Sequence, residues 1–186
     1  MKSAFMIQRP QKIFIHTDSP EFEGKYWKQL LEIPGFKEVL EIKKVSIPTQ
    51  VFGVEFFWNA HKADVLRLGR YFFYIFLFII FDIVKVHFRL LVLKKYGGIY
   101  LDNDIYVINK LDKYRHFEFT LGWPDGEWIG NMLMMGHRDA RFITQFIDTY
   151  KNFRSDIWYY NGGEKPVREV TFSNVILLCI HCRPRY

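Results

Sequence analysis

The sequence predicts an α/β fold, and three observations near its start support this prediction. Lys12–His16 is a short apolar run typical of a buried strand, and the turn-forming segment Thr17–Pro20 follows it. Lys25–Glu32 has helical spacing and ends before a Pro-Gly pair, and Val39–Ile47 alternates like a second strand. These segments form a β-α-β unit. Ligands of open α/β sheets bind at the carboxyl ends of strands, where Thr17–Pro20 would lie.

The composition indicates one folded domain with an ordinary core. The chain has 186 residues, of which 49% are hydrophobic and 19% aromatic, so disorder is excluded as its main state. The net charge is +6, but the basic residues are spread among 20 acidic ones. This pattern favours an anionic small substrate over nucleic acid, which we do not expect as a partner.

Two helices and a short strand are predicted in the middle of the chain. Asn59–Leu68 has a helical pattern, in which Asp64 and Arg67 share one face. Taken alone, this pair is more typical of an ordinary surface ion pair. Arg89–Lys95 resumes a helical pattern, and the apolar strand Ile99–Leu101 follows a pair of glycines.

The strand is followed by Asp102 and Asp104, which form an Asp-x-Asp pair. Carboxylate oxygens are the ligands that Mg²⁺ and Mn²⁺ prefer, and these ions keep positions open for substrate phosphates. A metal bridging a diphosphate would neutralise the charge that builds on a leaving nucleoside diphosphate. By itself the pair is a weak signal, since short acidic turns are common.

Further strands and a long helix are predicted in the second half. Phe117–Leu121 and Met132–Met135 are strand candidates separated by the polar loop Gly122–Gly126. A helix follows from Asp139, its expected cap. One stripe of this helix is expected in the core and consists of Phe142, Ile143, Phe146, Ile147, Tyr150 and Phe153.

A longer pattern surrounds the two aspartates. It reads Tyr96-Gly-Gly-Ile-Tyr-Leu-Asp-Asn-Asp-Ile105 and is preceded by His61-Lys-Ala-Asp-Val-Leu-Arg67. Together the segments resemble the sugar-binding region of glycosyltransferase family 32-like proteins, which are related to initiation mannosyltransferase, α-1,4-galactosyl- and N-acetylglucosaminyltransferases and clostridial glucosylating toxins. The resemblance covers most of residues 10–167. It implies a GT-A-like fold with a mixed, mostly parallel central sheet flanked by helices.

The resemblance also implies roles for individual residues. Asp102 and Asp104 would hold the metal, Mn²⁺ or Mg²⁺, and the donor sugar, with Asp104 in direct metal contact. Asp64 would bind a sugar hydroxyl and Arg67 would contact the donor and hold the departing diphosphate. Asn131 matches a polar residue on the sugar and acceptor side, although it could instead be a turn asparagine.

Two more features concern the donor site. Gly97 and Gly98 would let the backbone approach the donor and turn the helix into the strand. Trp123 and Trp128, with Asp125 between them, could stack on sugar rings, although loop tryptophans are as often lids of a core.

The segment from Gly69 to about Arg89 departs from the family pattern, in which the Asp-x-x-Arg helix runs almost directly into the Gly-Gly turn. We therefore expect an anomalous apolar insert at about 69–89, which we interpret as translated intron sequence or another gene-model error. Its uninterrupted apolar run, Tyr71–Phe81, is shorter than the about 20 residues that span a membrane. Membrane contact through residues 71–84 is nevertheless possible if the segment is exposed.

The ends of the chain are also atypical. The tail at 170–186 is unlike the family, so we expect a fold that is incomplete at the C-terminus and lacks a third metal ligand from that part. Cys179 and Cys182, with His181 between them, offer too few ligands for structural zinc. Met1–Pro10 has no apolar run that could serve as a signal or anchor.

The sequence thus predicts a metal-dependent glycosyltransferase. It would move a hexosyl or N-acetylhexosaminyl group from a UDP- or GDP-sugar to a glycan or glycolipid hydroxyl, with retention at the anomeric carbon. The resemblance places such enzymes in the Golgi lumen or membrane. Two alternatives remain open: an inactive or truncated relative that only binds nucleotide-sugar or nothing, and a metal-dependent phosphohydrolase that uses the same carboxylates.

Overall fold

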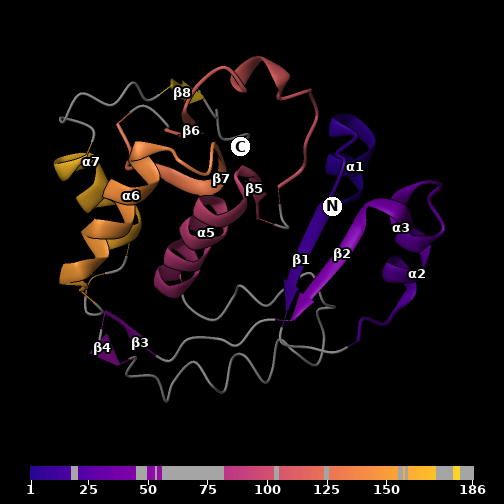
Figure 1. Ribbon diagram of the computed structural model, residues 1–186, viewed down its shortest axis with the longest axis horizontal. Coiled ribbons are helices and arrows are strands. Elements are labelled where there is room, and N and C mark those ends of the chain that lie inside the picture. The colour runs from indigo at the N-terminus through magenta and orange to yellow at the C-terminus, as the bar shows by residue number, and fades with distance from the viewer. Residues whose placement is uncertain are drawn as a thin grey trace. The chain divides into compact units, whose positions relative to one another are not determined.

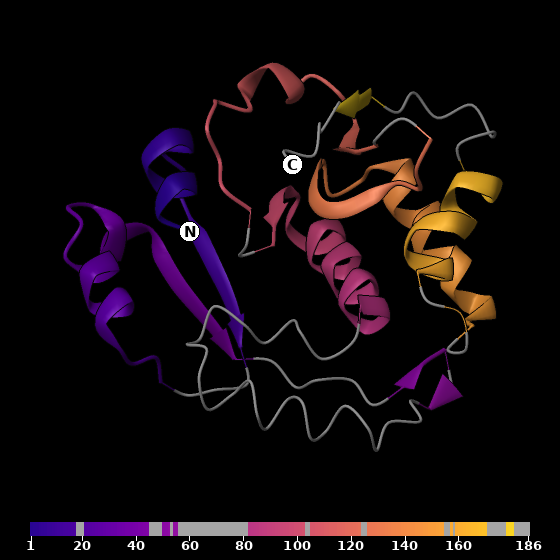
Figure 2. The same ribbon diagram turned by 180° about the vertical axis from the view of Figure 1, so that it is seen from behind.

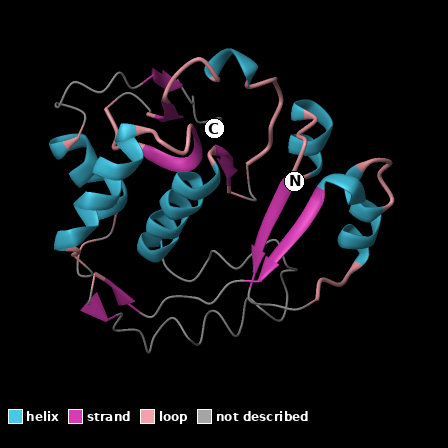
Figure 3. Ribbon diagram, viewed as in Figure 1, coloured by secondary structure: helices cyan, strands magenta, loops and turns pink. Residues whose placement is uncertain are grey.

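The computed structural model describes residues 1–17, 21–44, 50–52, 54–55, 82–102, 105–123, 126–154, 157, 159–170 and 178–180 (Figures 1 and 3). These residues group into two compact units. The first has its described residues within 1–48 and 106–110, and the second within 49–57, 81–105 and 111–186. The single domain over 1–186 that the sequence suggests stays a prediction.

The first unit contains the predicted β-α-β arrangement. Its strands β1 and β2 are parallel, with Ile13 opposite Leu40. Phe36 is fully buried and packs edge-to-face on Phe5, with 5.2 Å between the ring centroids. The segment 106–110 joins this unit, because Val107 N donates a hydrogen bond to Ser3 Oγ. The elements are α1 (Lys2–Gln8), β1 (Ile13–Thr17), α2 (Lys25–Leu31), α3 (Phe36–Val39) and β2 (Leu40–Lys44).

The second unit is built on a four-stranded sheet with the strand order β5-β7-β6-β8. It comprises β5 (Gly98–Leu101), β6 (Phe119–Gly122), β7 (Gly130–Gly136) and β8 (Leu178–Ile180). β7 is antiparallel to both of its neighbours, and only β6 and β8 pair in parallel. The expected mostly parallel sheet is therefore wrong for this sheet. β6 and β7 are joined by a short loop, and a short connection reverses the chain, whereas parallel strands need a long crossover.

The remaining elements of this unit are helices and a small hairpin. One residue, Gly97, separates the end of α5 from the start of β5. Figure 2 shows the ribbon from behind. The elements are the hairpin β3 (Gln50–Val51) and β4 (Val54–Glu55), α5 (Asp82–Tyr96), the 3-10 helices η1 (Asp112–Tyr114) and η2 (Thr149–Asn152), α6 (Arg141–Asp148), the π-helix η3 (Tyr160–Glu164) and α7 (Lys165–Glu169).

Helix α5 begins earlier than the sequence pattern indicated. It starts at Asp82 and runs without a break to Tyr96, so the last part of the predicted insert, 82–89, belongs to the helix that leads into the glycine turn. Leu90 and Leu93 from this helix are buried. The other predicted insert residues, Gly69 to Phe81, lie outside the described part of the chain.

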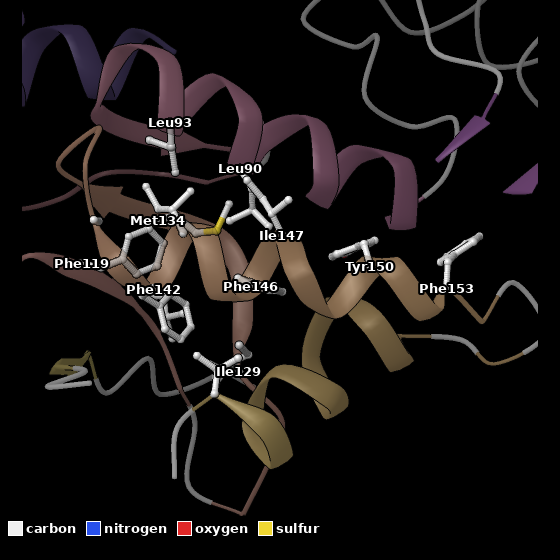
Figure 4. Close-up of a cluster of buried hydrophobic side chains, with 14 residues drawn as sticks. Leu90, Leu93, Phe119, Ile129, Met134, Phe142, Phe146, Ile147, Tyr150 and Phe153 are labelled. Carbon is white, nitrogen blue, oxygen red and sulfur yellow. The ribbon is translucent and has the colours of Figure 1, made fainter. Parts of the chain in front are cut away.

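The core of the second unit lies between α5, α6 and the sheet. The predicted stripe of α6 is confirmed, and it continues through η2 to Phe153. Figure 4 shows Leu90 and Leu93 of α5 facing the α6 side chains, with Phe119 and Met134 of the sheet beside them. Phe119 packs on Phe142 with ring centroids 4.9 Å apart. This packing holds α5 against the sheet and so sets the position of the residues near its carboxyl end.

The start of α6 differs from the prediction. Its N-cap is Ala140, and Asp139 is almost fully exposed and pairs with Arg138. The group that receives the backbone N–H of Arg141 is the carboxylate of Glu118, from the segment just before β6. Glu118 also accepts hydrogen bonds from the Arg141 side chain, with Nη2 to Oε2 at 2.7 Å. The helix is therefore capped across the fold, which local sequence patterns do not register.

No helix among the described residues is long and apolar enough to cross a membrane.

Candidate functional site

A glycine turn brings α5 and β5 together at the centre of the second unit. Gly97 has φ +66° and its N–H donates to Leu93 O at 2.7 Å, which ends the helix with a left-handed residue. A Cβ at Gly97 would lie 3.1 Å from Arg138 N and 3.3 Å from Gly136 O. Gly98 follows with φ +99° and begins β5. The turn thus needs glycine for both conformation and space, and it lets α5 fold back beside the strand.

Arg89 of α5 lies next to Asp102, the first aspartate of the Asp-x-Asp pair. Its side chain is 5% exposed, and Nη2 is 2.8 Å from Asp102 Oδ1. Nη1 donates to Asn131 Oδ1 at 2.6 Å. The guanidinium also lies over the Tyr100 ring, with Cζ 4.8 Å from the centroid. A buried cation is thereby paired with a carboxylate, an amide oxygen and an aromatic face.

Tyr100 makes a second contact with the same carboxylate. Tyr100 and Asp102 are two residues apart along the chain, and the hydroxyl donates to Asp102 Oδ1 at 2.6 Å. Burial raises the pKa of Tyr100 well above its ordinary value; the guanidinium of Arg89 opposes this, and Asp102 adds to it. The hydroxyl therefore stays protonated and remains a donor. Asp102 Oδ1 is held from two directions, and Asp102 N donates to Met132 O at 2.8 Å.

Asn131 of β7 is the third residue that contacts the Arg89 guanidinium, besides Asp102 and Tyr100. It is 7% exposed, and its Nδ2 donates to Gly162 O at 3.1 Å and to Tyr159 Oη at 3.4 Å. The sequence suggests either a sugar ligand or a turn asparagine for this position. In the structure Asn131 lies within a strand and its amide is engaged on both sides by the protein.

Among the described residues of this cluster, the carboxylate of Asp102 is the group suited to a hard metal ion. Among the described residues, no group of three or more His, Cys, Asp or Glu side chains could hold a metal ion. Asp102 is 22% exposed and is a hard oxygen ligand of the type that Mn²⁺ and Mg²⁺ take. Its Oδ1 already accepts hydrogen bonds from Arg89 and Tyr100. The direct metal contact expected of Asp104 stays a prediction, because this residue lies outside the described part of the chain.

The predicted site residues are only partly placed by the structure. Gly97, Gly98, Asp102 and Asn131 lie in the second unit, around the turn and β7. Asp64, Arg67 and Asp104 lie outside the described residues, so their predicted roles stay predictions.

Sequence reasoning missed Arg89, which it had placed at the border of the insert. A signal was present, because the resemblance expects the arginine-bearing helix to run almost directly into the Gly-Gly turn. In this chain the helix that does so is α5, and Arg89 is its buried arginine.

The tryptophans of the loop before β7 have different surroundings. Trp123 packs against the core cluster, and its Nε1 donates to Glu127 O at 2.8 Å. Trp128 is 40% exposed, and Arg168 lies over its ring at 5.8 Å. Trp123 therefore resembles the core lid that the sequence offered as an alternative, whereas Trp128 keeps an exposed surface. Asp125 lies outside the described residues, as do His181 and Cys182.

Comparison with known proteins identifies the region around this cluster. Residues 84–120 match the glycosyltransferase sugar-binding region containing a DXD motif. The match includes Arg89, both glycines and both aspartates. It begins inside the predicted insert, so most of α5 belongs to the matched region. These residues confirm the predicted resemblance to the sugar-binding region of glycosyltransferase family 32-like proteins.

A curated relative supports the same class. The chain is 27% identical over 176 residues to glucan organizing enzyme 1 of Cryptococcus neoformans var. grubii serotype A. The similarity covers 89% of this chain but 40% of the relative, so the chain spans well under half of that protein's length. No solved structure matches the chain. The GT-A fold that the resemblance implies is therefore an expectation, while the mixed α/β architecture is observed.

Proposed function

We propose that this chain carries the donor site of a metal-dependent glycosyltransferase. The substrate would be a UDP- or GDP-sugar, and a hexosyl or N-acetylhexosaminyl group would pass to a glycan or glycolipid hydroxyl with retention. The observation that carries the proposal is Asp102, which lies at the exit of β5 inside the DXD region and is held by Arg89 and Tyr100. A carboxylate fixed in this way is ready to orient a polar ligand without reorganising.

The roles follow from the chemistry of the side chains. Asp104 and Asp102 would hold Mn²⁺ or Mg²⁺. When bound, the ion would neutralise the charge on the leaving diphosphate. Arg89 keeps Asp102 in place. An added Cβ at Gly98 would meet no atom within 4 Å, so a donor could approach the backbone at this glycine. The chain's own contribution is thus positioning and electrostatic stabilisation, which need no strong general base.

The acceptor and the location are proposed from the resemblance. The name of the fungal relative makes a glucan the first acceptor to test. The Golgi lumen or membrane is the proposed location, as for enzymes of this group.

A ligand-binding measurement tests the donor site first. A ligand that binds only the folded state raises the melting temperature by mass action. We expect Mn²⁺ with one of a panel of UDP- and GDP-sugars to raise it, and neither the metal nor the sugar nucleotide alone to do so fully. The shift should disappear in Asp104→Ala and Asp102→Asn. Asp139→Asn is the matched control, because that carboxylate is 88% exposed and pairs with its neighbour Arg138.

Product analysis then separates the reactions. Transfer of sugar to an acceptor identifies a glycosyltransferase, whereas release of inorganic phosphate without transfer would indicate the phosphohydrolase alternative. A melting shift without any turnover would indicate a relative that only binds nucleotide-sugar. A well-folded sample with no shift for any donor would contradict the proposal.

A further inference from the structure

A second layer of hydrogen bonds lies behind the Arg89–Asp102 pair and reaches the π-helical segment η3. We propose that Asn131 and Tyr159 are positioning residues, which hold Arg89 and through it Asp102, and that Asn131 is not a ligand of the donor. This inference rests on the proposed function. It adds residues 159–164 to the part of the chain that supports the donor site. It differs from the role that the resemblance implies for Asn131.

The hydrogen-bonding capacity of the Asn131 side chain is filled by the protein. Oδ1 faces Arg89, whose guanidinium can only donate, so the orientation of the amide is set by its partner. The amide nitrogen then has two protons, which point to Gly162 O and to Tyr159 Oη. With 7% of the residue exposed, a sugar hydroxyl would have to displace one of these contacts to reach the amide.

The donor and acceptor directions along the chain of contacts agree. Tyr159 Oη donates its proton to Ile129 O at 2.6 Å, and the same oxygen accepts a hydrogen bond from Asn131 Nδ2 at 3.4 Å. The Arg89 Nη1 also contacts Asn131 O at 3.3 Å. Arg89 thus donates both to Asp102 and to Asn131, and Asn131 in turn donates to Tyr159, the N-cap residue of η3.

Backbone strain at Tyr159 indicates that its position is imposed by its surroundings. Tyr159 has φ +61°, an unfavourable conformation for a residue with a Cβ. Its ring lies against Gly163, where an added Cβ would overlap the ring, and its carbonyl accepts from Gly163 N at 2.9 Å. π-Helical turns are often found at functional sites. This one presents Gly162 O and Tyr159 Oη to the same amide group of Asn131.

The hydrogen bonds of Asn131 and Tyr159 predict that the Arg89 side chain is immobilised. An arginine that is held by Asp102 and Asn131 should show slow rotation of its guanidinium and resolved Nη resonances in ¹⁵N NMR spectra, assigned by their loss in Arg89→Lys. Tyr159→Phe keeps the ring that packs on Gly163 and removes only the hydroxyl. We expect this variant to shift or broaden the Arg89 resonances, and Asn131→Ala to do so more strongly. Tyr106→Phe is the matched control, because that hydroxyl belongs to an exposed side chain of the first unit.

Binding of Mn²⁺ with UDP and of Mn²⁺ with GDP connects the network to the donor site. We expect about threefold weaker binding of the preferred nucleotide in Tyr159→Phe and about tenfold in Asn131→Ala, with no change in Tyr106→Phe. Urea midpoints for all variants identify any loss caused by unfolding. If Asn131→Ala does not fold, Tyr159→Phe carries the test.

The outcomes separate the inference from the proposed function. Altered Arg89 resonances together with weaker nucleotide binding support the positioning role. Altered resonances with unchanged nucleotide binding, or unchanged resonances in both variants, overturn it while the proposed function stands. A wild-type protein that binds neither nucleotide would overturn the proposed function, and the positioning role with it.

Discussion

The guanidinium of Arg89 and the carboxylate of Asp102 meet at 2.8 Å, although one lies on helix α5 and the other beyond the end of strand β5. The glycine turn between these two elements makes the contact possible, because it folds the helix back beside the strand. The pair is partly buried, so both charged groups have lost much of their hydration. The attraction between them compensates for this loss. The consequences of this dependence can be measured.

Removing the carboxylate should destabilise the fold as well as the donor site. Asp102→Ala leaves Arg89 buried without its counter-charge, and we expect a loss of about 3 kcal/mol in the free energy of unfolding. The double variant Arg89→Met/Asp102→Ala should be more stable than Asp102→Ala alone, since the unpaired charge is gone. Urea unfolding of the two single variants and the double variant measures this coupling, and strictly additive losses would contradict it.

The Tyr100 hydroxyl should stabilise the protein up to alkaline pH. Burial raises the pKa of Tyr100 in the folded state, so its contribution is fully present below the ordinary tyrosine value of about 10 and is lost as the pH rises above it. Tyr100→Phe removes the contact with Asp102 and should cost about 1 kcal/mol near pH 7. The stability difference from the wild type should shrink between pH 9 and pH 11, followed by urea unfolding at each pH.

Tyr106→Phe is the control for removing a hydroxyl from an exposed tyrosine. It should leave stability within error of the wild type over the same range. A constant difference between the wild type and Tyr100→Phe at every pH would show that the Tyr100 pKa is not raised.

The cap that Glu118 provides for α6 should make stability fall in acid. Hydrogen bonds from the side chain and the backbone N–H of Arg141 lower the pKa of Glu118. Its contribution is therefore present above the unfolded pKa of about 4.3 and is lost as the pH falls through the lower folded value. Glu118→Gln should cost on the order of 1 kcal/mol at pH 7 and less below pH 4. Asp139→Asn, at the position that the sequence suggested as the cap, should change stability little at either pH.

The glycine turn should tolerate no Cβ at its first position. Gly97→Ala combines a left-handed backbone with a Cβ close to backbone atoms of the neighbouring loop and strand. Gly126→Ala is the matched control, because Gly126 has φ +77° and open space around a Cβ. The control should lose about 1–2 kcal/mol from backbone strain, and Gly97→Ala should lose clearly more. Equal losses in urea unfolding would mean that the close approach at Gly97 is unimportant.

Much of the second unit could be predicted from local patterns. The stripe from Phe142 to Phe153 is buried as its helical spacing indicated, and the strand before Asp102 and the strand containing Met134 lie where apolar runs predicted them. These predictions succeeded because hydrophobic periodicity reflects which face of an element is removed from water. The Asp-x-Asp region was likewise visible in the sequence, since it is contiguous.

Contacts between distant segments were not predictable in this way. The predicted mostly parallel sheet failed for β5, β6 and β7, because strand pairing is a tertiary property that apolar runs do not encode. The cap of α6 was assigned to Asp139, the nearest suitable residue, whereas Glu118 reaches the helix from before β6. Arg89 was placed at the border of an insert because the segment from Gly69 to about Arg89 exceeds the family spacing between the Asp-x-x-Arg helix and the glycine turn.

The sequence by itself determined the resemblance to glycosyltransferases, the turn from Gly97 to Asp102 and the apolar faces that form the core. Each of these depends on residues that are close together in the chain. The tertiary structure alone decided which arginine meets Asp102 and what Asn131 contacts. Those choices depend on packing α5, β7 and η3 together, where a buried charge or amide is stable only beside partners that lie far from it in the chain.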